Sequence, residues 1–282
     1  MAYTIGWFST GRGPGSRNLL KSIVDAIAAG DIGAHISYVF CSREEGEAEG
    51  SDRYIRMVRD YGLSLVTFSA RAFKPDMRKQ GKQDPAVMQG WRIEYDREVM
   101  ARLAAFSSDI VVLAGYMLIV GEELCDKYDL INLHPAAPNG PAGTWQEVIW
   151  KLMEERSRES GVMMHLVTRE LDKGPRLTYC TFPLRDAAIN PLWDDFEQKL
   201  RIKKSLDLII REEGEANPLF QEIRKRGAIR ELPLIVQTLK TLSAGIISIK
   251  DKQVMVGNKV CKEPYCLTEA IEAAIKNNRP PA

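Results

Sequence analysis

Short apolar runs alternate with longer stretches of helical periodicity along the first half of the chain. The runs are rich in Val, Ile, Leu or aromatic residues and predict strands at Tyr3–Phe8, His35–Cys41, Ser64–Phe68, Asp109–Leu113 and Leu130–Leu133. Helices are predicted between them at Arg17–Ala29, Asp52–Tyr61 and Met88–Phe106. Alternation of strand and helix is typical of βαβ units, which build a parallel sheet. The pattern therefore predicts a doubly wound α/β fold with a mostly parallel sheet.

The second half adds a helix near residues 143–156 and two strands, Val162–Val167 and Leu177–Pro183, joined by a charged turn. A charged, mostly helical region follows at 186–230. We expect one domain over residues 1–282, with a core at 1–185, a helical insertion at 186–230 and a C-terminal extension at 231–282. That extension is predicted to contain a helix (Ile229–Ser243), a hairpin (Ile246–Val256) and a polar tail (Asn277–Ala282).

Composition and charge exclude some classes of partner. The 282 residues are 45% apolar and 27% charged with a net charge of +1, so no basic surface for nucleic acid or anionic lipid is expected. The longest apolar stretch, Ile110–Val120, is shorter than the roughly 20 residues that span a bilayer. The N-terminus lacks a signal-peptide pattern, which predicts a cytoplasmic protein. The protein is expected to be a monomer or a homodimer. Five scattered cysteines predict reduced thiols and no metal site.

A glycine-rich turn joins the first strand to the first helix. It reads Ser-Thr-Gly-Arg-Gly-Pro-Gly-Ser-Arg-Asn over residues 9–18. Glycines let backbone amides approach an anion, and the helix N-terminus contributes positive charge, so the turn is a candidate phosphate site. A nicotinamide dinucleotide is disfavoured because Cys41 and Ser42 stand where an acidic residue would bind the ribose. A tight turn that needs glycine only for its geometry is the alternative.

A second motif, Asn-Leu-His-Pro at residues 132–135, closes the strand Leu130–Leu133. Asn132 and His134 are two residues apart and project to the same side, at the strand end where open α/β sheets bind ligands. A lone histidine is more often a core residue. His134 differs from His35 and His165, which lie inside strand patterns, because it adjoins a loop rich in Pro, Gly and Ala.

A third motif, Glu-Leu-Asp-Lys-Gly-Pro at residues 170–175, lies in the turn between the two later strands. Alone it is ordinary turn chemistry. Together, Asn132, His134 and Asp172 meet the needs of acyl transfer to an amine. Amide and imidazole groups stabilise the oxyanion, and a carboxylate holds the protonation state of the imidazole while protons move. No serine or cysteine nucleophile is needed, because the amine attacks directly.

These motifs, in this order and spacing, resemble the folate-dependent formyltransferase family, whose fold is Rossmann-like. The resemblance runs from the first strand to about Pro183 and includes the runs at 109–117 and 161–168. Within the family, the glycine-rich turn is similar to that of members that formylate 5-phosphoribosylglycinamide in purine biosynthesis. The resemblance implies a transferase that uses 10-formyltetrahydrofolate as co-substrate and small molecules as its only partners.

Roles for individual residues follow from the resemblance. It implies that Asn132, His134 and Asp172 are catalytic. It implies that the acceptor phosphate is bound by Gly13, Gly15, Ser16, Arg17, Asn18 and Arg92. It implies that the folate is bound by Met117, Leu118, Ile119, Val120, Asn132, Thr168, Arg169, Glu170 and Leu171.

The sequence departs from the family pattern at several positions. Arg12, Pro14 and Arg17 extend the glycine-rich turn, and Leu118 stands where family members often have an arginine. The family glutamate that contacts the ribonucleotide has only a displaced candidate, Glu231. Alternatives therefore stay open: a formyltransferase for another amine, such as an amino sugar nucleotide, or a folate-binding homologue without turnover. A nucleotide-binding module unrelated to folate would explain only the first turn.

Overall fold

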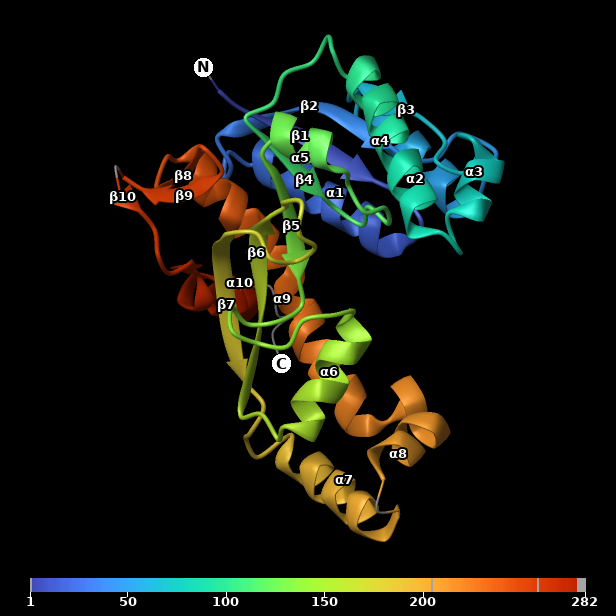
Figure 1. Cartoon of the computed structure of the whole chain (residues 1–282). Helices are drawn as coiled ribbons and strands as arrows, with labels where there is room; N and C mark the ends of the chain where they lie inside the picture. Colours follow the sequence, from blue (N-terminus) through green and yellow to red (C-terminus); the bar gives the residue numbers. More distant parts are fainter. Residues whose placement is uncertain (1, 204, 258, 278–282) are drawn as a thin grey trace. The chain divides into compact units, whose positions relative to one another are not determined.

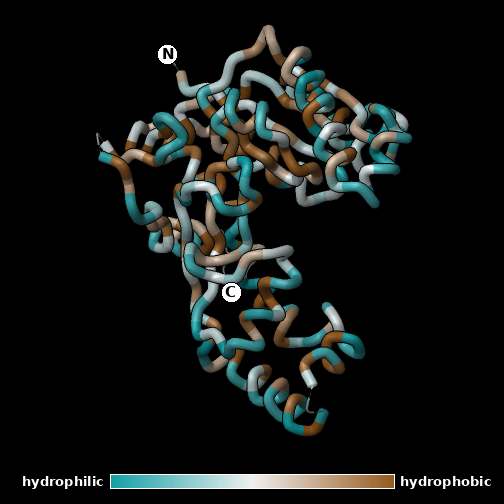
Figure 2. The backbone as a smooth tube through the Cα atoms, in the orientation of Figure 1, coloured by the Kyte–Doolittle hydropathy of each residue, from teal (hydrophilic) through white to brown (hydrophobic). Residues whose placement is uncertain are grey.

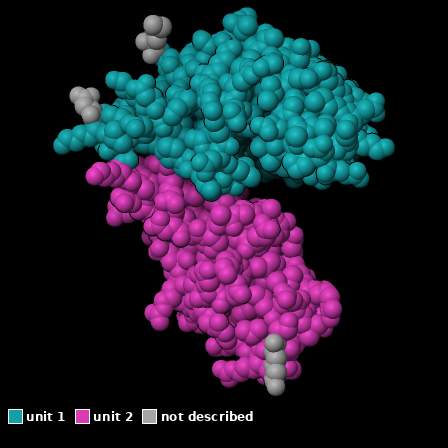
Figure 3. All heavy atoms as spheres, in the orientation of Figure 1, with its two compact units in different colours: residues 1–132, 165–175, 239–261 teal, residues 133–164, 176–238, 262–282 magenta. Residues whose placement is uncertain are grey.

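The chain forms two compact units, each assembled from three separate stretches of sequence. The computed structural model describes residues 2–203, 205–257 and 259–277, and Figure 1 shows the course of the chain. The first unit comprises residues 1–132, 165–175 and 239–261 (teal in Figure 3), and the second comprises residues 133–164, 176–238 and 262–282 (magenta).

The first unit contains a parallel sheet. Its strands are β1 (Tyr3–Ser9), β2 (Ala34–Cys41), β3 (Leu65–Thr67), β4 (Ile110–Leu113) and the first residues of β5 (Leu130–His134). Parallel pairing of β1 with β2 and β4, of β2 with β3 and of β4 with β5 gives the order β5-β4-β1-β2-β3. All four residues of β4 and the last five of β1 are buried. Brown, apolar segments accordingly run through this sheet in Figure 2.

Helices connect these strands: α1 (Pro14–Ala28), α2 (Glu49–Asp60), α3 (Pro75–Gln80), α4 (Pro85–Arg102) and α5 (Glu122–Lys127). Right-handed crossovers place α1 and α2 on one face and α4 and α5 on the other, and the members of each pair contact each other. The α4 face covers an aromatic core in which Trp91 stacks on Tyr95, with ring centroids 5.0 Å apart. This is the predicted doubly wound arrangement.

A three-stranded antiparallel sheet also belongs to the first unit. It consists of β8 (Ile247–Lys250), β9 (Gln253–Val256) and β10 (Lys259–Val260). Lys252, in the turn between β8 and β9, donates from Nζ to the carbonyl of Tyr128 (2.7 Å) and pairs with Oδ1 of Asp129 (2.8 Å). This contact ties the hairpin to the start of β5.

The second unit combines strands with most of the C-terminal helices. Its elements are α6 (Trp145–Glu154), β6 (Glu159–Leu166), β7 (Arg176–Pro183), α7 (Asn190–Lys203), α8 (Leu206–Glu213), the 3-10 turn η1 (Gly214–Ala216), α9 (Pro218–Ser243), β11 (Tyr265–Cys266) and α10 (Thr268–Asn277). The last residues of β6 and of α9 belong to the first unit. β11 pairs parallel with β7, and Trp193, Phe196 and Phe220 are buried in its core.

The seven predicted strands of residues 3–183 are present, and the predicted hairpin is β8–β9. The predicted helix from Ile229 is corrected, because α9 already begins at Pro218 and continues through Pro233. Its start is fixed by Asn217, whose Oδ1 accepts the N–H groups of Leu219 (3.0 Å) and Phe220 (3.2 Å). Five elements were not predicted, namely α3, α5, β10, β11 and α10. Of the predicted tail, residues 278–282 lie outside the described residues.

Candidate active site

The loops after β1 and β4 are joined where the strand order changes direction. Thr10, directly after β1, donates its N–H to the carbonyl of Gly115 (3.1 Å), and its Oγ1 accepts the N–H of Met117 (2.9 Å). Crossovers leave β1 and β4 in opposite directions, so a crevice forms at their carboxyl ends. The sheet therefore presents a ligand position between these two loops.

The glycine-rich turn supplies backbone amides to this position. α1 begins at Pro14 with Gly13 as N-cap and without a side-chain cap, so its first N–H groups are available to an anion. A Cβ on Gly13 or Gly15 would meet no atom within 4 Å, so both glycines face open space. Ser16 is buried instead, and a Cβ on Gly115 would lie 2.5 Å from its Oγ. Arg17 donates from Nη1 to the carbonyl of Gly50 (3.4 Å).

Arg92 comes from α4, on the other face of the sheet. It is half-buried. Burial raises the pKa of Asp96, one turn further along α4, and the charge of Arg92 opposes that rise. Of the residues predicted for the phosphate, Gly13 thus caps α1 and residues 15–18 lie at the start of that helix, whereas Arg92 comes from a separate element.

A cavity of about 230 Å³ lies within the first unit, beside the ends of β4 and β5. It is lined by Leu113, Tyr116, Met117, Leu118, Ile119, Val120, Asn132, His165, Val167, Thr168, Arg169, Leu171 and Asp172. The N–H of Val167 donates to the carbonyl of Leu130 (2.8 Å), which holds the segment 165–175 against β5. Folding therefore brings together three stretches that the sequence separates, and every predicted folate residue except Glu170 lines the cavity.

Several apolar side chains of this cavity are exposed. Met117 is 59% exposed, Ile119 46% and Leu171 61%. Large exposed apolar groups around a cavity are typical of a ligand site, because a bound apolar molecule would remove them from water. Arg169 is directed elsewhere, with Nη2 2.6 Å from Oδ2 of Asp126 on α5. Its predicted contact with folate is thus limited to backbone or to the stem of the side chain.

Asn132 and His134 both lie on β5, two residues apart. Asn132 is paired with Leu113 of β4 and lines the cavity. His134 is 4% exposed, and its Nε2 lies 3.4 Å from the carbonyl oxygen of Pro141. In the tautomer that carries hydrogen on Nε2, His134 donates a hydrogen bond to this carbonyl.

Asp172 occupies a constrained turn. Its φ is +56°, a left-handed conformation that Asp tolerates better than most residues. The turn closes tightly, because a Cβ on Gly174 would lie 1.8 Å from the carbonyl oxygen of Leu166. Asp172 Oδ1 lies 3.7 Å from Nε2 of His165, which is 2% exposed and whose Nδ1 is 2.9 Å from the carbonyl of Leu166.

His165 is a site residue that the sequence did not single out. Its position inside a strand pattern suggested a structural role, whereas the structure places it in the cavity wall beside Asp172. The sequence feature that could have indicated His165 is its place near the end of β6, combined with the tight turn that closes at Gly174. That combination becomes visible only when the turn geometry is known.

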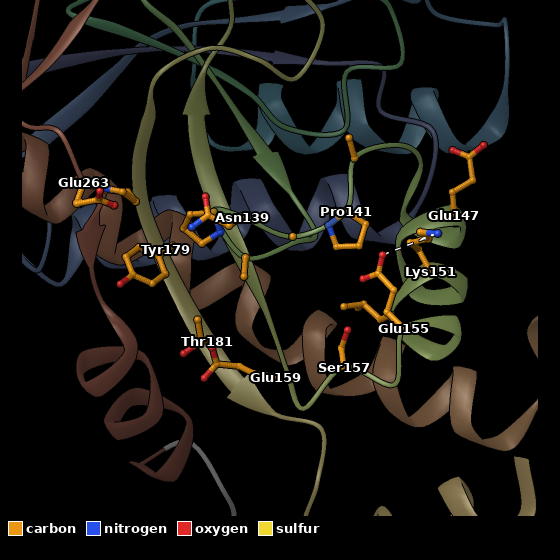
Figure 4. Close-up of a pocket in the computed structure, with 16 residues that line it drawn as sticks. Asn139, Pro141, Glu147, Lys151, Glu155, Ser157, Glu159, Tyr179, Thr181 and Glu263 are labelled. Atoms are coloured by element: carbon orange, nitrogen blue, oxygen red, sulfur yellow. Dashed lines mark ion pairs between the residues drawn. The ribbon is translucent and has the colours of Figure 1, made fainter. Parts of the chain in front are cut away.

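A second cavity, of about 840 Å³, lies within the second unit (Figure 4). Its charged lining residues are four glutamates and one lysine: Glu147, Glu155, Glu159, Glu263 and Lys151. Lys151 pairs with Glu155 at 3.8 Å, the dashed line in Figure 4. A surplus of carboxylates disfavours a phosphate ligand here.

Three further observations concern metal binding, membrane spans and Glu231. Among the described residues, no group of three or more His, Cys, Asp or Glu side chains is placed to hold a metal ion. No helix in the described part of the chain is both long enough and apolar enough to cross a bilayer. Glu231, the displaced candidate for ribonucleotide contact, forms an ion pair with Arg224 of the same helix.

An α/β sheet with an amide-lined turn and an apolar cavity at its switch point defines a class of proteins that bind small molecules there. The sequence model of the family described as Formyl transferase matches residues 13–184, more than half of the chain. The chain belongs to this formyl transferase family.

Named relatives and solved structures agree with the family. Phosphoribosylglycinamide formyltransferase of Escherichia coli is 29% identical over 173 residues, covering 60% of this chain and 70% of that protein. The enzyme of the same name from Dictyostelium discoideum is 29% identical over 170 residues, covering 57% and 75%. The solved structure of phosphoribosylglycinamide formyltransferase from Coxiella burnetii has a TM-score of 0.62 and 17% identity and covers 94% of this chain and 99% of that one, a likeness of fold.

Proposed function

We propose that this protein transfers a formyl group from 10-formyltetrahydrofolate to the amine of 5-phosphoribosylglycinamide, a step of purine biosynthesis. One observation carries the proposal. The amide-lined turn at residues 13–18 and the apolar cavity with Asn132 and Asp172 adjoin each other at the switch point of one sheet, joined through Thr10 and Gly115. A phosphorylated acceptor and a folate donor would thus bind side by side.

The apolar wall at residues 117–120 suits the pterin ring of the donor. Thr168, Arg169 and Leu171 line the same cavity, and their backbone groups would hydrogen-bond the edge of the ring. The acceptor phosphate would bind the free amides at the start of α1, where the helix dipole adds to the attraction.

In the reaction, the acceptor amine attacks the formyl carbon and forms a tetrahedral intermediate. We assign to Asn132 and His134 the stabilisation of its oxyanion, and to Asp172 the control of the protonation of the site. The bond from the formyl carbon to folate N10 then breaks, and a proton leaves the amine and reaches N10. Asp172 lines the cavity, with its Oδ1 3.7 Å from Nε2 of His165, and would relay that proton.

The test is formyl transfer from 10-formyltetrahydrofolate to 5-phosphoribosylglycinamide, followed by the appearance of tetrahydrofolate. Amino sugar nucleotides serve as parallel acceptors, and a reaction without acceptor measures hydrolysis of the donor. Turnover with the ribonucleotide alone supports the proposal. Turnover only with another amine, or only with water, would refute the proposed acceptor. Failure to bind both 10-formyltetrahydrofolate and tetrahydrofolate would refute the whole assignment. The cytoplasmic location and the oligomeric state stay predictions.

A further inference from the structure

The apolar wall of the folate cavity is an irregular segment fixed at its two ends. Near its start, Met117 donates its N–H to Oγ1 of Thr10 (2.9 Å). At its end, Gly121 donates its N–H to Oδ2 of Asp96 (2.5 Å). The residues between these two bonds, 118–120, all line the cavity. The position of the wall therefore depends on two polar groups that belong to other elements.

Asp96 is an unusual residue for its place on α4. It is 2% exposed, while the other buried residues of this helix, Trp91, Tyr95 and Val99, are apolar or aromatic. A buried carboxylate costs free energy unless its hydrogen bonds compensate. A role in packing alone would be met by an apolar side chain. The carboxylate is explained by the backbone N–H that it accepts.

The contact also fixes the residue type at position 121. A Cβ on Gly121 would lie 2.7 Å from Oδ2 of Asp96 and 3.9 Å from the backbone carbon of Arg92. α4 therefore approaches the end of the wall so closely that only glycine fits without a shift. Gly121 is also the N-cap of α5, so the same bond sets where that helix begins.

Charged and titratable groups surround Asp96 on three sides. Burial raises the pKa of Asp96 to about 7, and Glu123 of α5 adds to the rise, whereas the Gly121 N–H and Arg92 of α4 lower it. Burial raises the pKa of Tyr95, Tyr116 and Cys125, and the charge of Asp96 adds to each rise. The charge of Asp96 thus changes near neutral pH.

We propose that Asp96 is a positioning residue that holds the segment 117–121 in place and thereby sets the affinity of the cavity for the folate donor. The inference rests on the proposed function. Asp96 touches the wall and not the reacting atoms, so its loss changes donor binding far more than the chemical step.

The first experiment compares Asp96→Ala with Asp96→Asn. Loss of a charge-assisted hydrogen bond is expected to raise the KM for 10-formyltetrahydrofolate about tenfold or more in Asp96→Ala. The KM for the acceptor and kcat are expected to stay within about threefold of wild type. Asp96→Asn keeps an oxygen that accepts the Gly121 N–H and is expected to restore most of the donor affinity.

Val99→Ala is the matched control. Val99 is 0% exposed, lies three residues further along α4 and packs in the same aromatic core. Its truncation lowers stability by opening a cavity and leaves the Gly121 contact in place. Equal changes of donor KM in Val99→Ala and Asp96→Ala would mean that Asp96 acts only through stability, and would overturn the proposal.

Two further measurements separate this inference from the proposed function. Calorimetric binding of tetrahydrofolate needs no acceptor. The affinity for tetrahydrofolate is expected to rise between about pH 6 and pH 8 in wild type and to stay level in Asp96→Asn, because a carboxylate at position 96 titrates in this range and a carboxamide does not. Hydrogen exchange of the amides at 117–121 needs no folate. Absence of folate binding by wild type would refute the function, whereas unchanged amide protection in Asp96→Ala would refute the positioning role.

Discussion

Asn132, His134 and Asp172 carry the proposed chemistry, and substitutions of His134 and of Asp172 test it. His134→Ala is expected to lower kcat by about 10²–10⁴-fold, the usual contribution of a general acid or base. Tetrahydrofolate affinity is expected to change little, because His134 is not among the residues that line the cavity. Steady-state kinetics and calorimetry measure the two effects. His35→Ala, at an exposed position of β2, is the control, and near-normal turnover of His134→Ala would refute its role.

Asp172 offers a test that separates charge from backbone conformation. Its φ of +56° suits Asn as well as Asp, so Asp172→Asn is expected to keep the turn and remove only the charge. We expect kcat to fall at least about 10²-fold with an unchanged melting temperature. Asp172→Ala would add a loss of stability, because Ala adopts this conformation at a cost. Full activity in Asp172→Asn would show that the carboxylate is not needed.

The sequence could reveal some of these residues and not others, for a physical reason. Asn132 and Asp172 stand at a strand end and in a turn, where local pattern and residue type already indicate chemistry. His165 lies inside a strand and Asp96 inside a helix. A histidine is common on the buried face of a strand and an aspartate on the solvated face of a helix, so neither residue indicates a site by its type. Their importance comes from the contacts of His165 with Asp172 and of Asp96 with Gly121, which depend on how a strand meets a turn and how a helix meets a loop.

The first turn of α1 makes a prediction for a whole element. Gly15 has no neighbour where a Cβ would be, so Gly15→Ala is expected to leave the fold intact and to stabilise α1 by about 0.5–1 kcal/mol. A phosphate bound against the amides of this turn would meet the new methyl group, and the acceptor KM is expected to rise about tenfold. Donor affinity should not change.

Gly33→Ala is the matched control for this test. Gly33 also has open space around it and lies between α1 and β2. It should leave both KM values unchanged. An unaltered acceptor KM in Gly15→Ala would move the phosphate away from this turn.

Elements were predictable in proportion to their length and periodicity. The strands of the parallel sheet are rich in apolar residues and were found, whereas α3 and α5, with six residues each, are too short to show a helical stripe. α10 was missed because it is short and has only two large apolar side chains, Ile271 and Ile275, of which Ile271 is its one buried residue in the described part of the helix. The correction at α9 concerns only the start of the helix, because the residues before Ile229 were assigned to the charged helical region 186–230, whereas α9 begins at Pro218.

For the molecule as a whole, Asp96 links stability to pH. Its pKa is about 7 in the folded chain against 3.8 for the ordinary side chain. The fold therefore binds this proton more tightly than the unfolded chain does, and the free energy of unfolding falls as pH rises between these two values. Above pH 7 the cost of the buried charge is fully present.

Asp96→Asn removes this titration. Relative to wild type, the variant is expected to gain about 2–3 kcal/mol in free energy of unfolding between about pH 5 and pH 8. Denaturant unfolding at several pH values measures the gain, with Val99→Ala again as control. A constant difference between Asp96→Asn and wild type across this range would contradict the raised pKa. The expected result would mean that Asp96 lowers the stability of the wild-type chain while it holds the segment 117–121 in place.

The division of both units among separated stretches also bears on synthesis. The first unit needs residues 239–261 as well as 1–132, and the second needs residues 262–282 as well as 133–164. At about 5–20 residues per second, a ribosome takes roughly 6–26 seconds to pass from residue 132 to residue 261. During that time the parallel sheet lacks the hairpin that Lys252 ties to β5. The first unit thus stays incomplete until nearly all of the chain has been made, and release of the chain before residue 261 would leave neither unit whole.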